Sequence, residues 1–177
     1  MPRQHSDSQE FSRFVEADSV GHHRMERRIA ANPEERTALA RRFGLVSLDR
    51  LEASFSLRRA GSGVIHVTGT LEADVVQSCV VTLAPVPAKI AESFAADFAA
   101  DSGGMADPDL DFEEADPPEP IRNGHIDLGE LAAGQLALAL DPYPRAPGAA
   151  IPPEYSPGAE PEPAAVPTVN PFSILKK

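Results

Sequence analysis

The chain has 177 residues, of which 42% are hydrophobic and 18 are prolines, and its formal net charge is −11. This length holds one domain of ordinary size with tails, and the proline content indicates that part of the chain lies outside the core. The single Cys79 excludes an internal disulfide, no apolar run is long enough to span a membrane, and residues 1–10 lack a secretory-signal pattern. We therefore expect a cytoplasmic protein.

The charge is divided along the chain. Residues 1–60 carry eleven Arg and nine Asp or Glu, a net charge of +2, whereas residues 61–177 carry five Lys or Arg and eighteen Asp or Glu, a net charge of −13. Because an acidic surface repels phosphate groups, any direct contact with nucleic acid is expected in the Arg-rich first third. A basic protein partner suits the remainder.

The first elements expected are two short strands, at residues 11–15 and 24–30, followed by a helix at residues 33–43. Asn32 is suited to cap this helix, Pro33 to occupy its first position, and Glu35 to complete a capping box with Asn32. The sequence therefore predicts a short amphipathic helix after the second strand.

The middle of the chain has the pattern of an antiparallel sheet. Apolar and polar residues alternate over residues 51–58 and 65–72, which predicts a hairpin closed by a Gly-containing loop. A third strand is expected at residues 75–83, ending before Pro85. Residues 89–99 fit a helical and a strand spacing equally well, and we favour a strand.

An acidic segment and a second helix follow. Residues 97–119 contain nine acidic residues and no basic one, which predicts a solvated loop. Residues 126–140 are typical of a helix, with Asp127 as its cap, Glu130 three residues later, and an apolar row that Leu131 and Leu138 widen. We therefore expect a mostly buried helix that ends at the Asp-Pro-Tyr-Pro sequence of residues 141–144.

These elements predict an α+β fold. We expect a small antiparallel β-sheet packed by two short helices, with an acidic disordered loop and a Pro-rich C-terminal tail. The predicted domain covers residues 1–147, with the flexible acidic loop at about 100–120, and the tail covers residues 148–177.

Candidate chemistry is sparse. His22 and His23 are adjacent, but neighbouring strand residues point to opposite faces, which argues against a shared metal ion. Cys79 lies in an apolar run, where a buried small side chain is the ordinary interpretation. No phosphate-binding loop or nucleophile motif occurs. We expect a protein that is not an enzyme and that uses no cofactor, metal or small-molecule substrate.

Two sets of charged residues are candidates for contact with a partner. An RNA or partner contact is predicted for arginines in the first third: Arg24, Arg27, Arg28, Arg36, Arg41 and Arg42. A contact with a basic partner is predicted for the acidic segment: Asp107, Asp109, Asp111, Glu113 and Glu114. For both sets, a solvated surface is the alternative interpretation.

Several stretches, taken in order, resemble the YceD family of large ribosomal RNA subunit accumulation proteins, and its alphaproteobacterial branch most. They are QSCVVTLAPV at 77–86, PPEP at 117–120 after the acidic loop, IDLGEL at 126–131 and QLALALDPYPR at 135–145. Many relatives have a Cys-x-Arg-Cys stretch where this chain has Val81 and Thr82 in place of its arginine and second cysteine. A metal or redox role drawn from that cysteine pair therefore does not apply here.

The resemblance implies a non-enzymatic bacterial accessory factor for accumulation of the large-subunit ribosomal RNA, and hence for ribosome assembly. It would act by binding ribosomal RNA or a basic ribosomal protein. The alternative is a general acidic binding module, or a chaperone-like partner of basic proteins, unrelated to ribosomes.

Overall fold

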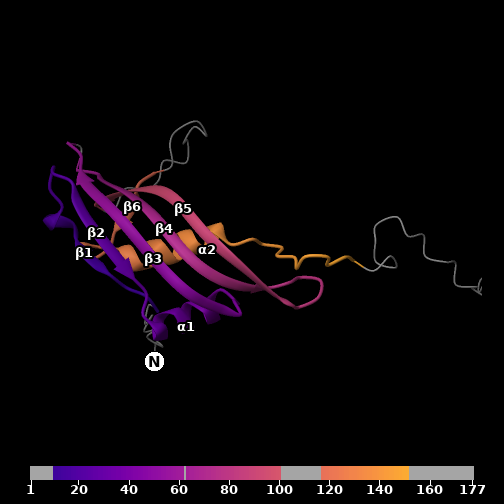
Figure 1. Cartoon of the computed structure of the whole chain (residues 1–177). Helices are drawn as coiled ribbons and strands as arrows, with labels where there is room; N and C mark the ends of the chain where they lie inside the picture. Colours follow the sequence, from indigo (N-terminus) through magenta and orange to yellow (C-terminus); the bar gives the residue numbers. More distant parts are fainter. Residues whose placement is uncertain (1–9, 62, 101–116, 152–177) are drawn as a thin grey trace, which may run out of the picture. The chain divides into compact units, whose positions relative to one another are not determined.

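Five strands form the main sheet in the order β2-β3-β4-β5-β6 (Figure 1). They are β2 (Met25–Ala30), β3 (Ser47–Arg59), β4 (Ile65–Ser78), β5 (Pro85–Ala100) and β6 (Glu119–Ile121). The first four run antiparallel to their neighbours, and β6 is parallel to β5. A separate two-stranded sheet pairs β1 (Phe14–Glu16) with β7 (His125–Asp127).

The structure is a computed structural model, and it describes residues 10–61, 63–100 and 117–151. The chain divides into two compact units, residues 1–146 and 147–177, and the strands and helices of the described residues belong to the first unit. The helices are α1 (Pro33–Arg42), α2 (Leu128–Ala139) and a single 3-10 turn, η1 (Ala17–Ser19). The expected α+β class is confirmed.

The core lies on one face of the main sheet, which we call the inner face. Alternate residues of β3 and β4 are buried there, as period-two side-chain alternation requires. The buried face of α2 and residues of the N-terminal segment belong to the same core cluster. The largest fully buried side chains are Leu51, Leu57, Ile65, Val67, Leu71 and Val75 from the main sheet, with Phe11, Val20, Leu39, Ile126, Leu128 and Leu136.

Helix α1 begins as the sequence predicts. The side chain of Asn32 accepts a hydrogen bond from the Glu35 N–H at 2.9 Å, and the Glu35 carboxylate accepts one from the Asn32 N–H at 2.8 Å. This reciprocal capping box satisfies two backbone donors that have no partner inside the helix. The predicted strand at 24–30 and the strand interpretation of 89–99 are also confirmed.

The prediction of a third strand at residues 75–83 is wrong. Residues 75–78 complete β4, Cys79 to Ala84 turn the chain, and β5 begins at Pro85. Proline was expected to end a strand because it lacks an N–H. It is accepted in β5 because the nitrogens of Pro85 and Pro87 face away from β4.

Three further boundaries differ from the predictions. Residues 97–100 belong to β5 and Glu119 to β6, so both ends of the expected loop are strand residues, and residues 101–116 lie outside the described part of the chain. Residues 126–127 belong to β7, and α2 begins at Leu128. At the N-terminus, Phe11 is buried but precedes β1, which starts at Phe14.

The expected breadth of the buried face of α2 is also wrong at one position. Leu136 is fully buried, but Leu138 is 80% exposed. Asp127 caps the helix as predicted, accepting hydrogen bonds from the N–H groups of Gly129 and Glu130. The buried face is therefore narrower than the sequence suggests, because no described element packs over Leu138.

Candidate functional site

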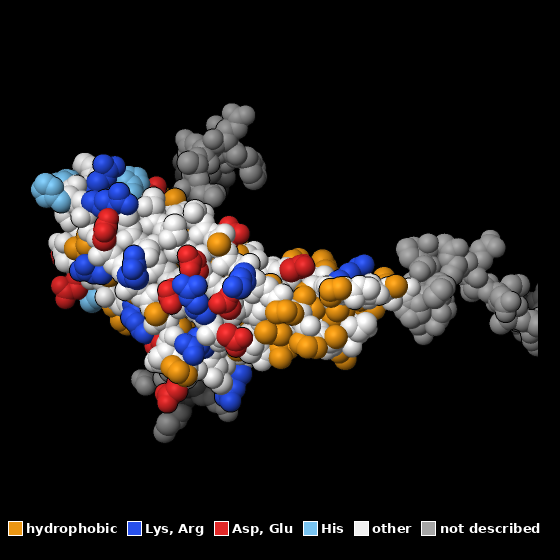
Figure 2. Space-filling view, viewed as in Figure 1, with side chains coloured by type: hydrophobic (Ala, Val, Ile, Leu, Met, Phe, Trp, Pro, Cys, Tyr) orange, Lys and Arg blue, Asp and Glu red, His pale blue; other side chains and the backbone are white. Residues whose placement is uncertain are grey.

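The second face of the main sheet, which we call the outer face, is crossed by no helix within the described part of the chain (Figures 1 and 2). Its residues are the polar members of the period-two alternation. In register across four strands, Arg28 is opposite Ser54, Ser54 opposite Thr70, and Thr70 opposite Ser93. One row of the sheet thus joins a guanidinium group to three hydroxyls.

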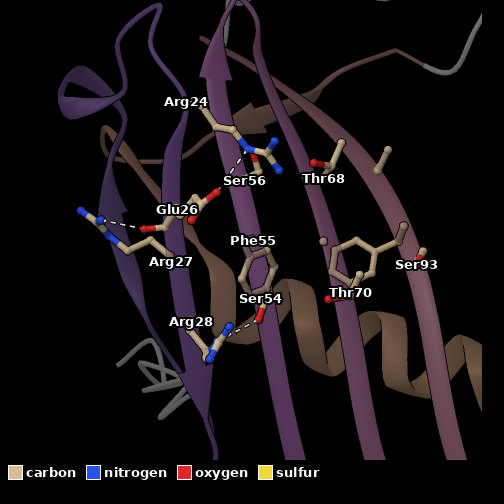
Figure 3. A pocket seen from close by; sticks show the side chains of 13 residues that line it. Arg24, Glu26, Arg27, Arg28, Ser54, Phe55, Ser56, Thr68, Thr70 and Ser93 are labelled. Carbon is tan, nitrogen blue, oxygen red and sulfur yellow. Dashed lines mark hydrogen bonds and ion pairs between the residues drawn. The ribbon is translucent and has the colours of Figure 1, made fainter.

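The next row places Ser56 opposite Thr68, with Glu26 and Ala95 at its two ends. We call the five hydroxyl residues the hydroxyl patch: Ser54, Ser56, Thr68, Thr70 and Ser93. A shallow hollow of about 970 Å³ lies over them and is also lined by Arg24, Glu26 and Arg28 (Figure 3). Arg27 borders the hollow as well, but in register it lies opposite the buried Phe55, and its side chain points away from the hydroxyls. The patch therefore offers hydroxyl donors beside positive charge, the combination that contacts phosphate and sugar oxygens in nucleic-acid complexes.

The three arginines come from β2, which is an edge strand, and from the residue before it. Arg28 Nε donates to Ser54 Oγ at 3.2 Å, and Arg27 donates to the Glu26 carbonyl oxygen at 3.0 Å (Figure 3). Arg24 Nε lies 3.6 Å from the Glu26 carboxylate. All three arginines are exposed, so these contacts are weak and leave the guanidinium groups able to bind a further anion.

The arginines of α1 do not join this group. Arg36 donates to the Ala31 carbonyl oxygen at 2.9 Å. Arg42 makes two hydrogen bonds to the Glu130 carboxylate, at 2.6 and 2.9 Å, and one to Glu10 at 3.4 Å. The bonds to Glu130 and its negative charge hold the pKa of Arg42 above its usual range. Arg42 therefore links α1 to α2.

This ion pair leads to a test of its contribution to stability. Both side chains are 36% exposed, so the pair is expected to contribute about 0.5–1 kcal/mol in a double-mutant cycle of Arg42→Ala and Glu130→Ala. Urea unfolding at low and high salt measures the coupling energy, which should shrink as salt rises. A coupling energy near zero at low salt would show that the pair does not fix α1 to α2.

Other charged groups border the outer face. Arg58 is exposed opposite His66, whose Nδ1 lies 2.5 Å from the Asp97 carboxylate, and Arg50 pairs with Glu72 at 2.7 Å. The predicted acidic contacts fall outside the described residues: Asp107, Asp109, Asp111, Glu113 and Glu114. The hydroxyl patch was absent from the predicted contacts, although its members occupy the polar positions of the predicted strands.

Cys79 is fully buried in the turn between β4 and β5. Its Sγ atom accepts hydrogen bonds from the N–H groups of Val81 and Thr82, each at 3.4 Å. The backbone N–H of Ala146 donates a hydrogen bond that lowers the pKa of Cys79 to about 6, and a hydrogen bond from the Thr82 hydroxyl makes the next largest contribution. The sulfur therefore organises the turn and does not face solvent.

The lowered pKa predicts a pH-dependent contribution to stability. A thiol whose pKa is lower in the folded chain than its usual value near 8.5 stabilises the fold fully above that value. The contribution disappears as the pH falls through about 6. Urea unfolding should therefore show a larger stability difference between wild type and Cys79→Ser at pH 9 than at pH 5.5. An equal difference at both pH values would contradict this assignment.

The described residues meet neither the requirements of a metal site nor those of a membrane-spanning helix. No group of three His, Cys, Asp or Glu side chains is arranged there to hold a metal ion. No helix in the same ranges is both long enough and apolar enough to cross a membrane.

The fold and the outer face define a class, a small α+β protein with one sheet face that no described helix crosses and that carries hydroxyl and guanidinium groups. A family model described as "Large ribosomal RNA subunit accumulation protein YceD" matches residues 67–177, which is more than half of the chain. The chain therefore belongs to the YceD family. No curated protein and no solved structure matches it at a significant level. The role that the family description gives is accumulation of the large ribosomal RNA subunit.

Proposed function

We propose that this protein acts in the cytoplasm as a non-enzymatic factor that binds ribosomal RNA and thereby supports accumulation of the large subunit. The binding surface is the outer face of the main sheet. The observation that carries the proposal is that Arg24 and Arg28 lie beside the hydroxyl patch, with Arg27 at its border, on a face that no described helix crosses.

The chemistry of the face suits a sugar-phosphate backbone. Guanidinium groups bind phosphate oxygens through paired N–H donors, and hydroxyls contact phosphate and sugar oxygens. The described aromatic residues of this region point elsewhere, since Phe55 is buried and Phe94 packs against it with ring centroids 5.7 Å apart. We therefore propose backbone recognition without base stacking on this face.

A replacement experiment in cells tests the proposed role. The triple variant Arg24→Gln, Arg27→Gln, Arg28→Gln replaces the native gene, with Arg41→Gln as the matched control because Arg41 is exposed on α1. We expect the ratio of large- to small-subunit RNA to fall with the triple variant, as with a gene deletion, and to stay normal with the control. A normal ratio with the triple variant at wild-type protein abundance would overturn the proposal.

The basic-partner hypothesis predicts a different result. If the chain were a general acidic binding module, material captured with it from cells would be rich in basic proteins of many kinds. If the chain binds ribosomal RNA instead, the captured material should contain large-subunit RNA, and the triple variant should capture much less of it.

A further inference from the structure

A second surface of the described residues with backbone groups free to bind a partner is one edge of the main sheet. Strand β5 pairs with β4 along its whole length, but on its other side it pairs with β6 only at residues 98–100. Within the described part of the chain, residues 85–97 have no strand on that side. An unpaired edge of this length is a template for an added strand.

The register shows which backbone groups point to this edge. The Cys79 N–H donates to the Ala84 carbonyl oxygen at 2.8 Å, and the pairing of β4 with β5 continues from there without a register shift. In an antiparallel ladder, alternate residues bond to the same neighbour, so even-numbered residues of β5 bond to β4. The odd-numbered residues point their N–H and C=O groups outward: Lys89, Ala91, Ser93, Ala95 and Asp97. This parity also explains why Pro85 and Pro87 cost β5 no bond to β4.

The two free edges of the sheet differ in character. Edge strand β2 carries Glu26, Arg27 and Arg28 in succession, and charges of this kind discourage pairing with another chain. The middle of the β5 edge, residues 91–96, has small and apolar side chains with a single charge, Glu92. On the inner side of this edge, Ile90 and Phe94 are only half-buried. An added strand with apolar side chains would complete their burial.

The position of β6 argues against a second copy of the chain as the occupant. Two β5 strands pair over all five outward residues only when they run antiparallel about Ser93. This pairing places residues 86–88 of the second copy beside residues 98–100, where β6 already lies. A short extended segment of at most about nine residues fits between β6 and the prolines without this clash.

The charge near the edge favours a basic segment. Glu92 is exposed on the inner side between Ile90 and Phe94, and it has no hydrogen bond or ion pair within the described residues. Within residues 89–97, two exposed carboxylates, Glu92 and Asp97, outnumber one exposed cation, Lys89, and residues 61–177 as a whole carry a net charge of −13. We propose that the free edge of β5 at residues 89–97 binds an extended, positively charged segment of a partner protein as an additional strand. This surface is separate from the three arginines, so it does not depend on RNA binding.

Amide hydrogen exchange on the full chain tests the edge without any substitution. In the free protein, the N–H groups of Ala91, Ser93 and Ala95 are expected to exchange much faster than those of Ile90, Glu92 and Phe94. A capped nine-residue peptide of alternating Lys and Val serves as the probe. On its saturation, the three fast amides should become protected. Protection of those amides in the free chain, or binding of the peptide without their protection, would overturn the proposal.

Variants of the edge give a second test. Ala91→Pro removes an outward N–H and no bond to β4, so we expect about tenfold weaker binding of the Lys-Val peptide. Ala91→Val, which keeps the N–H, is the matched control and should bind as wild type does. Glu92→Gln should weaken binding about two- to fivefold, and the loss should shrink at high salt. Equal affinity of the proline and valine variants, with both folded by circular dichroism, would contradict strand addition.

Discussion

Replacing Gly129 by alanine is expected to lower the free energy of unfolding by about 3 kcal/mol, because the first turn of α2 has no room for a methyl group. A Cβ atom at this position would lie 2.3 Å from the Phe11 carbonyl oxygen and 2.9 Å from the Ser12 Cα. Both atoms belong to backbone, which cannot turn aside as a flexible side chain can. Arg13 holds that backbone in place, since its N–H donates to Asp127 and its carbonyl oxygen accepts from the Leu128 N–H.

The same helix supplies the matched control for this prediction. Gly134 has no atom within 4 Å of an added Cβ. Alanine is favoured over glycine inside a helix by about 1 kcal/mol, so Gly134→Ala should stabilise the protein by about that amount. Urea unfolding of both variants measures the two free energies. A Gly129→Ala variant as stable as the wild type, or more stable, would show that the close contact between α2 and the N-terminal segment is not as the structure has it.

The second large effect is expected on RNA affinity. Changing Arg24, Arg27 and Arg28 to glutamine should weaken binding of a large-subunit RNA fragment at least tenfold, because two positive charges beside the hydroxyl patch and a third at its border are lost. The slope of log affinity against log salt should also become shallower by about two, at about 0.7 for each phosphate contact to single-stranded RNA. Fluorescence titration over a range of salt concentrations measures both quantities.

The control for this experiment comes from α1. Arg36→Gln with Arg41→Gln removes two positive charges from the same third of the chain but none from the outer face. This double variant should change the affinity and the salt slope little. If it weakened binding as much as the triple variant, general charge would explain the affinity and the outer face would lose its assigned role.

Local signals predicted much of the fold. The capping box of Asn32 and Glu35 is confirmed because each of its hydrogen bonds depends only on residues three apart. Alternation over residues 51–58 and 65–72 predicted the central hairpin because one face of that sheet is buried. These features depend on neighbours in the sequence, which a single chain reveals directly.

The errors arose where distant pairing decides the structure. Whether Pro85 ends a strand depends on which side of β5 its nitrogen faces, and the register with β4 sets that side. The exposure of Leu138 depends on the absence of a described element over that side of α2, which helical spacing cannot reveal. Residues 125–127 pair with β1, more than a hundred residues earlier in the chain. Such contacts have no local signature.

The candidate site divides in the same way. Composition alone identified the Arg-rich first third, but it could not separate Arg24, Arg27 and Arg28 from Arg42. The structure separates them because Arg42 is paired with Glu130, whereas Arg24 and Arg28 lie beside the hydroxyl patch and Arg27 lies at its border. The patch itself could not be predicted, since its members come from three strands whose register the sequence does not give.

The most direct test of the account is an NMR titration of the full-length protein with a fragment of large-subunit ribosomal RNA. If the outer face binds RNA, the largest chemical-shift changes, and the first to saturate, will be those of residues 24–28 and of the hydroxyl patch on β3, β4 and β5. Residues of α1 and of the turn between β4 and β5 should shift little. If the saturable shifts fell on those elements and the outer face stayed unperturbed, the outer face would not be the RNA-binding surface.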